Sequence, residues 1–135
     1  MSKVKIIQSE KSITINDLIV FQQINNITIP ENLKQLLLKY NGGITINSDI
    51  FSQLLSIKYG ELTMGEIVEY NQVLEKNIPD NYLPFAITGV GHFLTIKLAN
   101  NNSGKIYVFR HDEFNPILIA ESLEEILGVI NISEL

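Results

Sequence analysis

Four segments of the chain place hydrophobic residues at the spacing of an α-helix. The clearest is residues 31–40, where every third or fourth position is Leu or Tyr and Pro30 stands at the start. The Asn-Gly-Gly sequence at 41–43 ends this helix, because glycine adopts a left-handed backbone without strain. Another helix is predicted at 16–24. Its hydrophobic stripe consists of Leu18, Phe21 and Ile24.

Capping boxes, in which Ser or Thr is followed three residues later by Glu, mark the other two helices. The box at 63–66 precedes a predicted helix of residues 64–76. The box at 122–125 begins a helix that should reach about residue 130. The inward face predicted for the 64–76 helix consists of Ile67, Tyr70, Asn71 and Leu74.

Short runs of alternating or continuous hydrophobic residues predict the strands, with turn-forming residues between them. The predicted strands are residues 44–50, 54–57, 85–87, 93–98, 105–110 and 117–119. The predicted order is therefore two helices, two strands, a third helix, four strands and a closing helix. Because the connections between the later strands are of hairpin length, we expect one α+β domain over residues 1–135, with a mainly antiparallel sheet and flanking helices.

The Asn-rich sequence at 100–104 should join two of these strands as a hairpin. In the simplest register Ala99 faces Lys105, and Leu98 then faces Ile106. The core face of this hairpin would consist of Leu94, Ile96, Leu98, Ile106 and Val108.

The opposite face of the hairpin is rich in aromatic residues. Its members would be Phe93, Thr95, Lys97, Tyr107, Phe109 and His111. Two interpretations remain open at this stage. A helix or a second core layer covers these aromatics, or they form an exposed surface for a protein partner. The same register sets His92 opposite Asp112, which we interpret as a structural hydrogen-bonded pair.

The charge of the chain is acidic and unevenly distributed. The 135 residues carry a net charge of −5. Residues 1–40 contain five basic and three acidic side chains, whereas residues 41–90 contain two and six, and residues 91–135 contain three and six. The net charge argues against nucleic acid or an anionic membrane as the partner and favours a basic protein. Two interpretations of the uneven distribution remain open: an ordinary solubilising surface, or an acidic patch formed by the last two-thirds of the chain. No run approaches the 18 apolar residues of a membrane span, and no signal peptide is visible, so we expect a cytoplasmic protein that is a monomer or a weak homo-oligomer.

The inventory of reactive side chains is poor. The chain has no cysteine and two histidines, His92 and His111. His111-Asp112 would need further His and Asp ligands to act as a metal centre. The glycines at 89–91 open a strand rather than a helix, so they do not form a dinucleotide-binding loop. We therefore expect no cofactor, no metal and no catalysis.

An ordered set of motifs resembles the SUKH superfamily, which includes the fungal Smi/Knr cell-wall regulators. The likeness covers about residues 14–130. The motifs are Ile-Pro at 29–30, Tyr-Asn-Gly-Gly at 40–43, Leu-Pro-Phe-Ala at 83–86, Gly-Val-Gly at 89–91, Gly-Lys-Ile-Tyr at 104–107, His-Asp-Glu at 111–113 and the closing segment at 119–127.

The resemblance implies a SUKH (Smi/Knr-like) fold without catalysis. Most bacterial members resemble immunity proteins of polymorphic toxin systems, each of which binds and blocks its cognate toxin, often a nuclease. The alternative is an intracellular protein-binding scaffold or regulator of the Smi/Knr type. For an immunity protein, acidic side chains would steer a basic toxin, and aromatic side chains would anchor it. The candidate partner-binding residues are Asp49, Glu61, Glu66, Glu69, Tyr107, Phe109, His111, Asp112 and Glu113.

Overall fold

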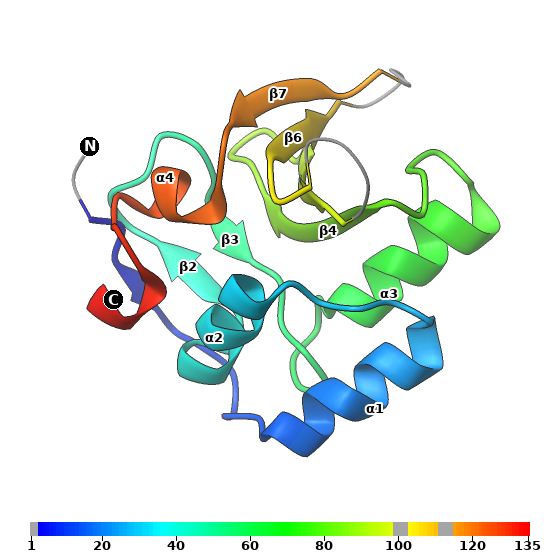
Figure 1. Cartoon of the computed structure of the whole chain (residues 1–135), viewed down its shortest axis with the longest axis horizontal. Coiled ribbons are helices and arrows are strands. Elements are labelled where there is room, and N and C mark those ends of the chain that lie inside the picture. Colours follow the sequence, from blue (N-terminus) through cyan, green and yellow to red (C-terminus); the bar gives the residue numbers. More distant parts are fainter. Residues whose placement is uncertain (1–2, 99–102, 111–114) are drawn as a thin grey trace.

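The computed structural model describes residues 3–98, 103–110 and 115–135. Over these residues the chain forms one seven-stranded sheet and four α-helices, an α+β domain as predicted (Figure 1). The strands are β1 (Ile6–Ile7), β2 (Gly43–Thr45), β3 (Gln53–Leu54), β4 (Tyr82–Ile87), β5 (Phe93–Lys97), β6 (Ile106–Phe109) and β7 (Ile117–Ala120). The helices are α1 (Ile15–Asn25), α2 (Glu31–Lys39), α3 (Met64–Val68) and α4 (Leu123–Leu127).

The sheet is a meander whose strands follow one another in chain order, and every neighbouring pair is antiparallel. Helix α1 lies beside α3, and α2 lies beside α4 (Figure 1). The core between sheet and helices is fully apolar at its centre, where Leu33, Leu36, Leu37, Phe85 and Ile96 are all buried. The N-terminal segment lies next to the end of α4, where the Val4 N–H donates to the Leu127 carbonyl at 2.9 Å.

The predicted hairpin register is wrong by two residues. Ile96 faces Ile106, and Leu94 faces Val108. The turn is longer than predicted, because Lys97 and Lys105 are its last bonded pair and the Leu98 N–H donates instead to the Asn81 carbonyl at 2.8 Å. A slip of two residues keeps every side chain on its predicted face, whereas a slip of one would have reversed the faces.

The helix predicted at 64–76 changes its winding halfway. After α3 the chain continues as a π-helix, η1 (Glu69–Leu74). The wider turn shifts the phase of the side chains, so the predicted inward face is wrong at Tyr70 and Leu74, which are exposed. It is right at Asn71, which is buried, and Gln72, which was not predicted to face inward, is buried beside it. Ile24 likewise points outward from α1, with 77% of its surface exposed.

The closing helix is shorter than predicted. It ends at Leu127, because Gly128 adopts a left-handed conformation with φ of 70°. The last residues form a 3₁₀ turn, η2 (Ile132–Glu134). The sequence also gave no sign of β1, whose two residues are too few to show a period.

Candidate functional site

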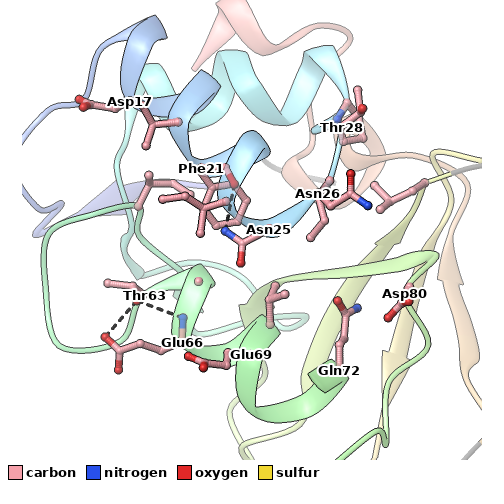
Figure 2. A pocket seen from close by; sticks show the side chains of 18 of the residues that line it. Asp17, Phe21, Asn25, Asn26, Thr28, Thr63, Glu66, Glu69, Gln72 and Asp80 are labelled. Carbon is pink, nitrogen blue, oxygen red and sulfur yellow. Dashed lines mark hydrogen bonds between the residues drawn. The ribbon is translucent and has the colours of Figure 1, made fainter. Parts of the chain in front are cut away.

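An open groove of about 1540 Å³ lies between α1 and the helical segment formed by α3 and η1. One wall consists of α1 and the residues that follow it, and the other consists of α3 and η1. Figure 2 shows Phe21 and Asn25 on the first wall, opposite Glu66, Glu69 and Gln72 on the second. Lys97 and Asp80 lie among the residues at the far end of the groove.

Local sequence signals hold the α1 wall in place. Thr14 and Asp17 form a reciprocal capping box, in which the Thr14 N–H donates to the Asp17 carboxylate at 2.9 Å. At the other end Asn26 takes the left-handed conformation with φ of 53° and ends the helix. The side chain of Gln22 then accepts a hydrogen bond from the Ile29 N–H at 2.8 Å, which ties the following loop to α1.

The opposite wall begins at Thr63, whose hydroxyl accepts from the Glu66 N–H at 3.3 Å and donates to the Glu66 carboxylate at 3.0 Å (Figure 2). Its second half is the π-helical segment η1. There the buried Gln72 amide donates to the Pro79 carbonyl at 3.0 Å and to the Tyr82 carbonyl at 2.6 Å. These two bonds fasten η1 to the start of β4. Single-turn π segments are common at functional sites, and this one forms part of a groove wall.

The electrostatics of the groove are dominated by carboxylates. Lys58 forms an ion pair with Asp17 at 3.2 Å. The Thr14 backbone hydrogen bond, followed by the Lys58 contacts, holds the pKa of Asp17 below its ordinary value, and the Asp17 contact raises the pKa of Lys58. Among the described residues Glu66 and Glu69 have no cation within ion-pair distance, so the α3 side of the groove carries uncompensated negative charge.

The structure brings together two of the sequence-predicted residues, Glu66 and Glu69, which both line the groove. Glu61 lies outside it and lines a smaller hollow next to Gly42 and Gly43. Asp49 is exposed and lines neither hollow. The predicted residues His111, Asp112 and Glu113 lie outside the described residues. The predicted pairing of His92 with Asp112 therefore involves a residue that the structure does not describe.

The two predicted aromatic residues lie on the sheet, away from the groove. Phe109 is buried, with 4% of its surface exposed, and Tyr107 is half-buried. The ring of Tyr82 meets both edge-on, with centroids 5.3 Å from Tyr107 and 5.1 Å from Phe109. Thr95 between them is fully buried. At Phe109 and Thr95 this face is therefore packed, whereas Tyr107 keeps part of its surface exposed.

Other groove residues were missed by the sequence analysis. Val20 and Ile24 on α1 and Val73 on η1 are exposed hydrophobic side chains that line the groove. The sequence of α1 could have indicated its exposed positions, because hydrophobic residues surround the whole helix. The exposure of Val73 could not be predicted in this way, because it depends on the π-helical turn. Asn25, whose amide donates to the Phe21 carbonyl at 3.0 Å, adds a polar group between these apolar positions.

Over residues 3–98, 103–110 and 115–135, no group of three or more His, Asp or Glu side chains could hold a metal ion. In the same ranges, no helix has both the length and the apolar character needed to cross a membrane.

The fold and the groove define an α+β meander domain with an acidic groove between two of its helical segments. The profile of the SMI1/KNR4 family (SUKH-1) matches residues 12–128. The chain belongs to this family, as the motifs in its sequence had indicated. No curated protein shows a significant match to the chain.

Proposed function

We propose that the protein is a non-catalytic immunity protein of a bacterial cell that binds a cognate polymorphic toxin in the cytoplasm and blocks it. Membership of the SUKH family supports this proposal, because the family often serves as immunity proteins. The observation that carries it here is the open groove with Glu66 and Glu69 on one wall, neither of which has a cation within ion-pair distance among the described residues.

The proposed partner is a basic protein, often a nuclease in such systems. Carboxylates at the edge of a groove accelerate encounter with a positively charged surface, and salt weakens that effect. The net charge of −5 acts in the same direction at longer range. Asp112 and Glu113, which lie outside the described residues, remain candidates for the same surface.

Neutralisation of a toxin gives the direct test. The chain should be co-produced with each secreted protein encoded next to its own gene, and cell growth and complex formation should be measured. We expect one neighbour to be toxic alone, harmless with this chain, and bound to it in a stable complex. If a neighbouring toxin is found and the chain neither protects nor binds, the proposal is wrong. A stable complex with a protein that is not toxic would favour the scaffold or regulator alternative instead.

Association kinetics separate the groove from the rest of the acidic surface. The double variant Glu66→Gln, Glu69→Gln removes two charges from the groove, and Asp49→Asn, Glu61→Gln removes two charges outside it. We expect the groove variant to associate with the toxin about fivefold more slowly at low salt, with a smaller effect at high salt. The control variant should change the rate less than about twofold. Equal rates for both variants would contradict a role for the groove.

A further inference from the structure

The groove between α1 and η1 is amphipathic across its width. Its α1 side presents Val20 and Ile24, and its other side presents Glu66 and Glu69. We propose that the groove holds one cationic amphipathic helix of the partner protein, about three turns long. This inference rests on the proposed function, because it specifies the element of the toxin that occupies the groove.

The apolar half of the argument comes from α1. Its inner side buries Leu18 and Phe21 in the core. Its outer side still carries four exposed hydrophobic residues, Ile15, Ile19, Val20 and Ile24. A helix that is hydrophobic all round is normally covered all round, whereas a surface helix keeps a polar outer face. Val20 and Ile24 are four residues apart and therefore lie one turn apart on the same side of α1. Residues at this spacing form a ridge that can pack into the groove between side chains of a partner helix.

The other side of the groove supplies a matching apolar contact and the charge. Val73 is 60% exposed on η1 and lines the same groove as Ile24. Glu66, Glu69 and Asp80 provide carboxylates along this side. Two lysines also line the groove: Lys58 is paired with Asp17, and Lys97 lies over the ring of Tyr82, 5.4 Å from its centroid. A partner helix with apolar residues on one stripe and Lys or Arg beside it would satisfy both sides at once.

The backbone of the groove walls favours a helix over an extended segment. The α1, α3 and η1 parts of the walls are helical, so their N–H and C=O groups are largely used within their own turns and offer no sheet edge to an extended peptide. A helix, in contrast, forms its backbone hydrogen bonds within itself and needs none from the groove. One that ran the length of the 11-residue α1 would measure roughly 16 Å, which is about three turns.

Synthetic peptides test this proposal without the toxin. The probe is a blocked peptide of about 14 residues with Leu at helical spacing and Lys on the flanking positions. The control is a peptide of identical composition in which shuffling removes the stripe. Binding should be followed by titration and by amide shifts in two-dimensional NMR spectra of the labelled protein. We expect the largest shifts at Val20, Ile24, Glu66, Glu69 and Val73, and affinity at least about tenfold higher for the striped peptide.

Matched variants distinguish binding of the peptide in the groove from non-specific hydrophobic binding to other parts of the surface. Ile24→Ser with Val73→Ser should weaken binding of the striped peptide about tenfold, whereas Val90→Ser with Ile130→Ser, which removes two exposed hydrophobic residues outside the groove, should not. Thermal unfolding of each variant should establish that it is folded. Equal binding of the shuffled peptide, shifts that map outside the groove, or equal losses in both variants would overturn the inference.

The two proposals fail in distinguishable ways. If the chain neutralises its toxin and the Ile24→Ser, Val73→Ser variant neutralises it equally well, the proposed function stands and the helix-in-groove inference is wrong. If no toxin is neutralised but the striped peptide binds in the groove and the variant loses it, the groove recognises a cationic helix and the proposed function is wrong.

Discussion

The side chain of Asn41 pairs with the backbone of Ile57 as a neighbouring strand would. Its amide nitrogen donates to the Ile57 carbonyl at 2.9 Å, and its amide oxygen accepts from the Ile57 N–H at 2.7 Å. The same nitrogen also donates to the Lys11 carbonyl at 2.8 Å. Asn41 is 2% exposed. The first residue of the Asn-Gly-Gly motif therefore joins the end of α2 to two segments far away in the chain.

Replacing Asn41 by Ala should lower the free energy of unfolding by about 3 kcal/mol. The substitution removes three hydrogen bonds and leaves the buried Ile57 N–H without its partner, which is costly away from water, whereas the Ile57 carbonyl keeps the bond from the Tyr59 N–H. Urea unfolding would measure the change. As the control, Asn77→Ala on an exposed site should stay within about 0.5 kcal/mol of the wild type. Similar values for the two variants would show that the Asn41 pairing contributes little.

Gly43→Ala should destabilise the protein by about 2 kcal/mol or more. Gly43 has φ of 129°, and a Cβ there would lie 2.7 Å from the Ile7 carbonyl oxygen, so the β1–β2 pair would have to move. Gly89→Ala is the matched control, since a Cβ there meets no atom within 4 Å. We expect its melting temperature to remain close to that of the wild type. A tolerated Gly43→Ala would mean that β1 can shift without loss.

Leu37→Ala should cost about 3 kcal/mol, because Leu37 is fully buried in the core beneath α2 and its loss leaves a cavity. Ile24→Ala should stay within about 0.5 kcal/mol of the wild type, since 77% of Ile24 is exposed. Calorimetric unfolding of both variants would compare them. A large loss for Ile24→Ala would indicate that this side chain supports the fold and is not reserved for a partner.

Acid should remove the stability that the Asp17 carboxylate contributes. The backbone hydrogen bond from Thr14, followed by the Lys58 contacts, holds the pKa of Asp17 below its ordinary value of 3.8. A carboxyl group with a lowered pKa in the folded state is protonated more readily in the unfolded chain. Its contribution is therefore complete above the ordinary pKa and disappears as the pH falls through the lowered one.

The variant Asp17→Asn keeps an oxygen that can accept the Thr14 bond and removes the charge. We expect it to be less stable than the wild type at neutral pH, with the difference shrinking to zero as the pH falls below the lowered pKa of Asp17. Urea midpoints measured over a pH series would show this convergence. A difference that persists unchanged at acid pH would mean that packing, and not the charge, is responsible.

Local sequence determined most of the elements of this protein. Helices α1 and α2 lie within about one residue of their predicted bounds. For α1 the capping box of Thr14 and the left-handed Asn26 act through the few atoms next to them, whereas α2 begins directly after Pro30 and ends where Tyr40 turns extended, before the predicted glycines. The core face of the β5–β6 hairpin was also correct, since alternation fixes the side of the sheet. The motifs that indicated the SUKH family depend on the same local chemistry.

Tertiary structure alone decided the register, the winding of η1 and the groove. Leu98 leaves the hairpin because the carbonyl of Asn81, from another loop, accepts its N–H. The turns of η1 widen where the amide of Gln72 reaches the carbonyls of Pro79 and Tyr82. Glu66 and Ile24 face one groove only because α1 packs beside α3. Contacts between residues far apart in the chain are set by the balance of many packing terms, and the pattern along the sequence carries no record of them.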